Sequence, residues 1–180
     1  QFRAALEYVT DQHYLKEPFN LYLARAEAAF SYGKETLNSH DRFLPPPYAL
    51  DRSRIAAKQP LLVSFERKKC HACDVLHAGP LQDERIDTML KQLDVVQLDL
   101  NADIPLITPG GKRTTARQWA QELRLDYAPT LLFFDEHGKE VVRIDSVVWF
   151  YRLSNVLKYV ISKGFIEHPT FQDWRQRNRR

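Results

Sequence analysis

An alternation of short apolar runs with helical segments, which begins near residue 50, is the feature that most constrains the fold of this chain. Apolar runs typical of buried strands lie at residues 61–65, 95–100, 131–134 and 141–144. Patterns typical of helices lie at residues 53–58, 73–78, 83–93, 115–123 and 151–162. A β-α-β unit followed by a β-hairpin and a closing helix predicts an α/β fold, in which helices flank a central mixed β-sheet.

The residues before this alternation are predicted to form a helical extension and a proline-rich connector. Apolar residues recur at helical spacing over residues 2–15, and a second helix is expected from Asn20, a suitable N-cap, to Phe30. The consecutive prolines at 45–47 favour a stiff, extended connector, because proline cannot lie inside a helix. The sequence therefore divides into the extension and connector (1–47), a main domain (48–165) and a basic C-terminal tail (166–180), which is interpreted as a solvated chain end.

A faint internal repeat relates residues 2–18 to residues 153–169. The identical pairs are Leu6 with Leu157, Tyr8 with Tyr159, Val9 with Val160 and Pro18 with Pro169. One interpretation is that residues 1 to about 18 are the closing helix of a preceding, similar domain. The other is chance similarity between two amphipathic helices.

Charge and hydropathy argue against several classes of function. The 26 Lys and Arg residues exceed the 23 Asp and Glu residues by only three charges, so nucleic acid or an anionic membrane is not expected as the main partner. No apolar run reaches the roughly 18 residues that a bilayer span requires, so no membrane span is predicted. Charged residues within the first twenty exclude an uncleaved secretory signal, but they leave open a signal that has been removed.

The chain contains only two cysteines, Cys70 and Cys73, which are too few for a disulfide scaffold and are spaced as a redox dithiol. Cys70 stands where the apolar run 61–65 gives way, through a charged segment, to a helix. Unpaired backbone N–H groups and the helix dipole favour a thiolate at such a position. Cys70 is therefore the predicted nucleophile, and Cys73, on the same helical face, is the predicted resolving residue.

Basic residues beside the dithiol would stabilise the thiolate further if their side chains turn toward it. The candidates are Lys68, Lys69 and a protonated His71. For both lysines, the alternative is a solvated loop charge.

The strand–CxxC–helix segment, together with Tyr127-Ala128-Pro129-Thr130 and the apolar strand after it, resembles a thioredoxin over about residues 50–165. The resemblance implies the thioredoxin fold and a thiol–disulfide oxidoreductase that reduces protein disulfides through a mixed disulfide. It also implies a cis bond before Pro129, which packs beside the dithiol, and an exposed backbone at Ala128 that pairs with an extended substrate segment. With His71, these residues make up the predicted substrate-binding set. The expected partners are a disulfide-containing protein and an upstream thiol electron donor.

A narrower resemblance is to periplasmic thioredoxin-like proteins associated with bacterial sulfur oxidation, which implies a periplasmic location. It is carried by the insertion 103–115, the helix 116–123 and the segment 164–172. Two positions depart from the thioredoxin pattern: Ser64 replaces a buried acid, and Lys69 replaces an aromatic residue. Serine cannot accept a proton near neutral pH, so deprotonation of Cys73 is expected to depend on water or on Glu66.

The sequence leaves two alternatives to the redox interpretation. Cys70, Cys73 and His77 have the spacing of three zinc ligands, with His71 nearby, which would fit a metal-binding module. No second ligand pair follows downstream, and one helical turn cannot close a tetrahedral site, so neither a metal nor a cofactor is expected. A non-catalytic interaction module is the other alternative, and the presence of both cysteines argues against it.

Overall fold

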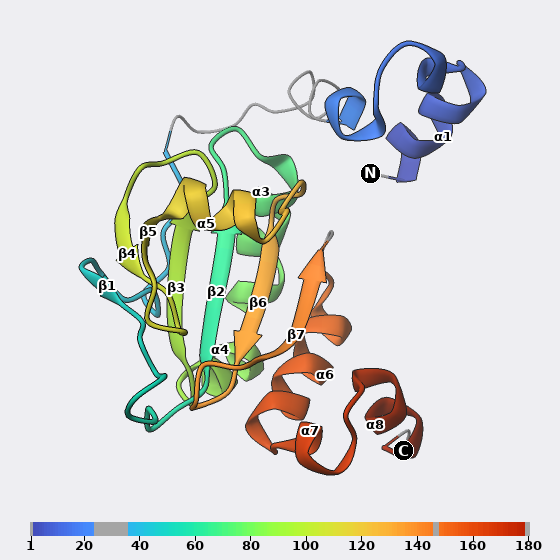
Figure 1. Ribbon diagram of the computed structural model, residues 1–180. Coiled ribbons are helices and arrows are strands. Elements are labelled where there is room, and N and C mark those ends of the chain that lie inside the picture. The colour runs from blue at the N-terminus through green and yellow to red at the C-terminus, as the bar shows by residue number, and fades with distance from the viewer. Residues whose placement is uncertain (1, 24–35, 146–147, 179–180) are drawn as a thin grey trace.

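The computed structural model describes residues 2–23, 36–145 and 148–178 (Figure 1). Its central sheet has the strand order β3-β2-β6-β7. The strands are β2 (Leu61–Glu66), β3 (Asp94–Asp99), β6 (Thr130–Phe134) and β7 (Glu140–Asp145). β2 runs parallel to β3 and antiparallel to β6, and β6 and β7 form an antiparallel hairpin. The sheet is therefore mixed, as predicted.

The two inner strands are buried along their whole length. Every residue of β2 and β6 is buried, which explains why the sequence shows continuous apolar runs there rather than alternation. Successive side chains point to opposite faces of a sheet. Leu62 accordingly belongs to one core cluster, whereas Leu61 and Val63 belong to another.

Helices cover both faces of this sheet. They are α3 (His71–Ala78), α4 (Glu84–Leu90), α5 (Ala116–Glu122) and α6 (Phe150–Ile161), with the 3-10 helix η2 (Pro80–Gln82) between α3 and α4. Leu76, Ile86 and Leu157, from α3, α4 and α6, share one core cluster, whereas Trp119 of α5 belongs to the other. Figure 1 shows α5 in front of the sheet and α3 and α4 behind it.

Side-chain caps fix where several helices begin. Asp83 precedes α4 and Thr115 precedes α5, and each side chain accepts a hydrogen bond from a backbone N–H of the first turn. Such caps satisfy donors that the helix itself leaves unpaired. These caps lie at the starts that the sequence predicted for both helices.

Two local predictions differ from the structure. The segment 103–115 contains a pair of strands, β4 (Pro105–Ile107) and β5 (Arg113–Thr115), which join β1 (Tyr48–Ala49) in a second sheet of order β1-β4-β5. Strands this short carry too little periodicity to be recognised. Residues 53–58 were predicted to be helical but form bends. There the backbone N–H and hydroxyl of Ser53 both donate to Asp51, at 2.9 and 2.7 Å, which favours a turn over a helix start.

The segment 166–180 was interpreted as a solvated chain end. Most side chains of its described residues, up to 178, are exposed, but the segment is helical rather than a loose end. Helices α7 (Gly164–Glu167) and α8 (Phe171–Arg177) pack against α6 instead. The ring of Tyr159 contacts Phe171 and Trp174, and its hydroxyl donates to the carbonyl of His168 at 2.7 Å. Aromatic residues three positions apart provide a packing face that the arginine-rich composition concealed.

The connector lies along the main domain. Leu44 donates its backbone N–H to the carbonyl of Val95 on β3 at 2.8 Å, and Phe43 forms a parallel bridge to the same residue. Arg42 makes two hydrogen bonds to Asp87 of α4, at 2.6 and 2.9 Å. The residues just before the three prolines are thus tied to the edge of the sheet.

The N-terminal extension forms a small apolar unit of its own. It contains α1 (Phe2–Thr10), the 3-10 helix η1 (His13–Leu15) and helical residues at 19–23; the rest of the predicted second helix, to Phe30, lies outside the described residues. Its buried cluster also contacts Tyr127 of the main domain.

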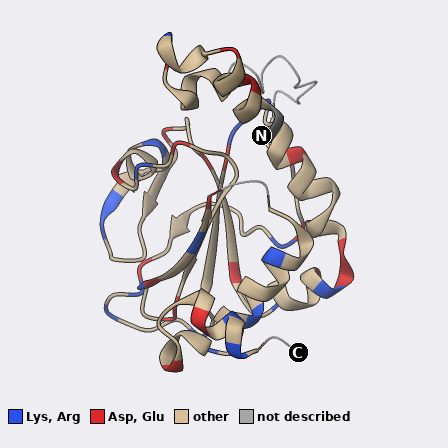
Figure 2. Ribbon diagram, turned by 90° about the vertical axis from the view of Figure 1, so that its right-hand side faces the viewer, with Lys and Arg blue, Asp and Glu red and all other residues tan. Residues whose placement is uncertain are grey.

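None of the helices in the described ranges is long and apolar enough to cross a membrane. In Figure 2, acidic and basic segments are interspersed over helices and loops.

Candidate active site

The two cysteines lie where β2 leads into α3. Cys70 is the N-cap of this helix, and the backbone N–H of Cys73 donates to Cys70 Sγ at 3.1 Å. The two residues are joined by a disulfide bond, with their Cα atoms 5.2 Å apart. When the pair is reduced, the same N–H and the positive end of the helix dipole favour a thiolate at Cys70.

The basic neighbours predicted to assist the thiolate lie at the surface. Lys68, Lys69 and His71 are all exposed. Lys69 adopts a left-handed backbone conformation with φ of 53°, which is unusual for a residue with a side chain and marks a tight turn into the helix. These three side chains therefore lie on the solvent side of the dithiol.

The loop before β6 meets the dithiol. The Ala128–Pro129 peptide bond is cis, and the Ala128 carbonyl oxygen lies 3.5 Å from Cys70 Sγ. The backbone at Ala128 was predicted to be exposed, but the residue is only 2 % exposed because it packs against both cysteines. The structure therefore brings together Cys70, Cys73 and the Ala128–Pro129 loop, whereas His71 lies on the exposed side.

A buried polar network accompanies the dithiol. Glu66, the last residue of β2, is 0 % exposed. Its carboxylate accepts a hydrogen bond from the Ser64 hydroxyl at 2.7 Å, and its two oxygens lie 3.1 and 3.0 Å from Nε2 of His77. A buried carboxylate is tolerated only when such partners compensate its charge.

His77 is the functional candidate that the sequence alone did not identify as an acid–base partner. It follows Cys73 by four residues on α3, so both side chains lie on one helical face. Its Nδ1 is buried without a hydrogen-bond partner among the described residues, and the ring of Phe43 packs edge-on at 5.7 Å between centroids. The sequence feature that could have pointed to this pair is the occurrence of three polar residues, Ser64, Glu66 and His77, in segments that are otherwise expected to be buried.

The side chains are not arranged as the zinc site that the spacing of Cys70, Cys73 and His77 suggested. The two sulfur atoms are bonded to each other, and Nε2 of His77 is directed at Glu66. Across the described ranges, no group of three or more His, Cys, Asp or Glu side chains is arranged to hold a metal ion.

Comparisons with known proteins agree with this architecture. A family model described as a thioredoxin-like domain matches residues 47–161. A comparison with the sequences of curated proteins finds no match.

Solved structures that resemble the chain include a thioredoxin-fold protein from Helicobacter pylori, with 12% identity, a TM-score of 0.58, and coverage of 72% of this chain and 86% of that chain. A thioredoxin from Thermus thermophilus has 19% identity, a TM-score of 0.47, and coverage of 59% and 76%. Thioredoxin O2 from Arabidopsis thaliana, in its oxidised state, has 17% identity, a TM-score of 0.43, and coverage of 58% and 76%. The family model and the first of these structures confirm the predicted fold.

Proposed function

The chain belongs to the thioredoxin-like domain family, and we propose that it is a thiol–disulfide oxidoreductase that reduces protein disulfides. The observation that carries the proposal is the Cys70–Cys73 pair at the start of α3, with the Cys73 amide 3.1 Å and the Ala128 carbonyl 3.5 Å from Cys70 Sγ. A dithiol at a helix N-terminus beside a backbone segment suited to bind an extended chain has the parts that disulfide exchange requires.

The proposed reaction proceeds in two exchanges. The Cys70 thiolate attacks one sulfur of the substrate disulfide, the substrate S–S bond breaks, and the departing sulfur takes up a proton. Cys73 then loses its proton and attacks Cys70 Sγ, which releases the second substrate thiol and leaves the enzyme disulfide. An upstream thiol donor returns two electrons and two protons to the pair.

The buried network offers a proton acceptor for the second exchange. Cys73 must be deprotonated before it attacks, and the serine at position 64 cannot serve near neutral pH. We assign this role to the Glu66–His77 pair, because His77 lies one helical turn after Cys73 on α3 and its Nε2 is hydrogen-bonded to the carboxylate of Glu66. In this proposal the acid is Glu66, two residues later on β2 than position 64, where the resemblance to thioredoxin implies an acid.

Substrate binding is proposed at Ala128 and Pro129, with His71 at the exposed side. An extended substrate segment would pair with the backbone at Ala128, once the loop or the N-terminal unit that contacts Tyr127 gives access. The partners are then a disulfide-containing protein and an upstream thiol donor. The narrower resemblance to proteins of bacterial sulfur oxidation supports a periplasmic location as part of this proposal.

Reduction of insulin by dithiothreitol tests the proposal. Wild-type protein should accelerate it, and Cys70→Ser should abolish the acceleration. Cys73→Ser should retain the first attack and accumulate a mixed disulfide, so that the two variants control for each other. Turnover of Cys70→Ser near the wild-type rate would exclude Cys70 as the nucleophile. Loss of trapping by Cys73→Ser would favour a non-catalytic module.

A further inference from the structure

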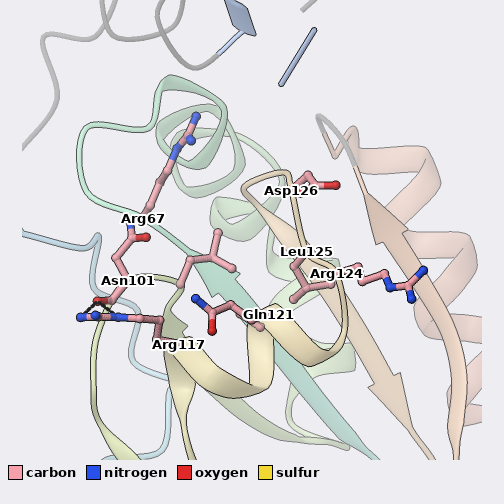
Figure 3. Close-up of a pocket in the computed structure, with 9 residues that line it drawn as sticks. Arg67, Asn101, Arg117, Gln121, Arg124, Leu125 and Asp126 are labelled. Atoms are coloured by element: carbon pink, nitrogen blue, oxygen red, sulfur yellow. Dashed lines mark hydrogen bonds between the residues drawn. The ribbon is translucent and has the colours of Figure 1, made fainter. Parts of the chain in front are cut away.

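A groove is lined by nine residues, three of which are arginines (Figure 3). Its volume is about 590 Å³. Arg67 comes from the loop after β2, Arg117 from α5, and Arg124 from the loop between α5 and β6. Leu100, Gln121 and Leu125 also line the groove.

The groove lies next to the segments that lead to the dithiol and to the proposed substrate loop, although neither cysteine lines it. Arg67 lies three residues before Cys70, and Asp126, which also lines the groove, lies two residues before Ala128. Leu100 packs against the cluster that contains both cysteines. A polypeptide bound at Ala128 with its disulfide at Cys70 therefore has the groove within a few residues' reach, since an extended chain advances about 3.3 Å per residue.

The charge of the side chains that line the groove favours an acidic ligand. Asp126 is the acidic residue among the lining side chains, against three arginines. Arg117 is held in place by donating to the Asn101 carbonyl at 3.0 and 2.8 Å, and Asp103 neutralises it in part at 2.9 Å. The three arginines and one aspartate of the lining give a formal net charge of plus two; Arg117 is also paired with Asp103, and Arg67 has an interaction of its own within the chain.

The directions of the side chains distinguish an extended ligand from a small anion. In Figure 3, Arg67, Arg117 and Arg124 point in different directions around the groove. A phosphate or sulfate site needs donors that converge on one point. Separated guanidinium groups above an apolar floor suit a chain that carries several carboxylates and apolar stems.

We propose that this groove binds an acidic segment of the substrate polypeptide next to its disulfide, and so selects substrates by charge. The inference rests on the proposed reductase function. It deepens that function by naming the substrate class: disulfide proteins with Asp or Glu within a few residues of the reacting cysteine. The groove arginines act as specificity residues, and they take no part in the exchange itself.

A peptide series tests the charge selection. Three disulfide-linked peptides of equal length carry Glu, Gln or Lys at the positions flanking one cysteine. The wild-type protein should reduce the Glu peptide with the highest kcat/KM and the Lys peptide with the lowest, with a difference of about tenfold that shrinks at high salt. Equal rates for the three peptides would overturn the proposal.

Variants locate the selection in the groove. Arg117→Gln/Arg124→Gln should reduce the preference for the Glu peptide over the Lys peptide about fivefold. The matched control, Arg175→Gln/Arg177→Gln, removes the same charge from α8 and should leave the preference unchanged. An equal loss of preference in both double variants would assign the effect to net charge and overturn the groove assignment.

A small neutral disulfide, bis(2-hydroxyethyl) disulfide, distinguishes a failure of the reductase function from a failure of the groove proposal. If neither the wild-type protein nor any variant reduces any disulfide, the proposed reductase function is wrong. If all reduce the neutral disulfide equally and show no charge preference among peptides, the reductase function stands and the groove proposal fails. Inhibition by inorganic phosphate as strong as that by an acidic peptide without cysteine would reassign the groove to small anions, which also contradicts the proposal. Should the double variant not fold, the salt dependence of the wild-type preference decides.

Discussion

Glu66 carries a carboxylate with no solvent access, four residues before Cys70. Its oxygens are hydrogen-bonded to the Ser64 hydroxyl and to Nε2 of His77. A single-residue change can therefore separate proton transfer from nucleophilic attack. In the proposed mechanism, Glu66 supplies the proton acceptor that serine at position 64 cannot provide.

We predict that Glu66→Gln slows resolution of the mixed disulfide about a hundredfold, because the amide keeps a hydrogen-bond acceptor for Ser64 but takes up no proton. Single-turnover kinetics between pH 6 and 9, about the range in which thiols titrate, measure attack and release separately. The first attack by Cys70 should change little. The matched control Glu84→Gln, at an exposed site on α4, should leave both steps unchanged. A slowed attack with normal release would contradict the assignment.

The lysines before Cys70 bear on the redox potential. Positive charge near the thiolate stabilises the reduced enzyme, so we expect a potential less negative than about −270 mV, the value of thioredoxin. Lys68→Gln/Lys69→Gln should shift it toward more negative values by about 10–30 mV. Equilibration with glutathione measures the shift, and Lys158→Gln on α6 is the control. A wild-type potential below −270 mV or an unshifted variant would contradict the role of these charges.

Local spacing was sufficient to predict that Cys70 and Cys73 lie together at the start of a helix, because the strand, the dithiol and the helix are contiguous in the sequence. The Ala128–Pro129 pair became informative only through its resemblance to thioredoxin. The Glu66–His77 contact could not be predicted, because it depends on where β2 ends relative to the rotation of α3. The groove arginines were equally hidden, since they come from three separate segments.

At the scale of elements, the sequence predicted those that bury a long apolar run or stripe. β2 and β6 are continuous apolar runs, and α6 has a regular apolar stripe, so their ends were placed within one or two residues. β4 and β5 are three residues long and depend on partners distant in sequence. The C-terminal helices were missed because basic residues dominate their composition, while their packing rests on the aromatic pair Phe171 and Trp174.

We predict that Gly164→Ala loosens α8 from α6. A Cβ there would lie 2.6 Å from Cδ1 and Nε1 of Trp174 and 2.9 Å from Cδ2 of Tyr159, so the rings must move. Overpacking of this kind costs about 1–3 kcal/mol of the free energy of unfolding. Thermal unfolding followed by tryptophan fluorescence measures it. Gly110→Ala is the control, since a Cβ there meets nothing within 4 Å; equal stability of the two variants would refute the contact.

The connector's link to α4 should depend on pH. The Arg42 guanidinium, helped by Lys91, lowers the pKa of Asp87 to about 2. Because the folded-state pKa is depressed, the stabilisation is present above the ordinary Asp pKa of about 3.9 and is lost as the pH falls toward 2. An NMR titration of the Leu44 amide, which bonds to Val95, should report this release. Asp87→Asn should remove the transition, and an unchanged titration in that variant would contradict the assignment.

Across the whole molecule, neither of the two core clusters of the main sheet contains a described residue of the N-terminal helices, 2–23, although Phe43 of the connector packs against one of them. They are built from the sheet, its helices and the C-terminal segment, whereas the extension has its own cluster and reaches the main domain at Tyr127. The break in pattern near residue 47 suggested a division at the same place, and that division remains a prediction. The sequence did not reveal that Leu44 bonds to β3 or that Arg42 bonds to Asp87 on α4.

We predict that deleting residues 1–18 leaves the fold and the disulfide reductase activity intact, because both core clusters remain complete. Circular dichroism and insulin reduction measure the two properties. Deleting residues 170–180, a truncation at the other end, removes the partners of Tyr159 and should lower the midpoint of thermal unfolding by several degrees. Loss of the folded state in the first truncation would show that the extension belongs to the core.

The bonds between the connector and β3 have a consequence for how copies of the chain meet. β3 and β7 are the outer strands of the central sheet, and an open strand edge invites pairing with another molecule. Leu44 occupies one backbone acceptor of β3, while β7 carries the charged residues Glu140, Arg143 and Asp145. Cleavage of the connector would uncover the β3 edge and promote intermolecular sheet growth, so the same segment that joins the extension to the domain also protects the protein from aggregation.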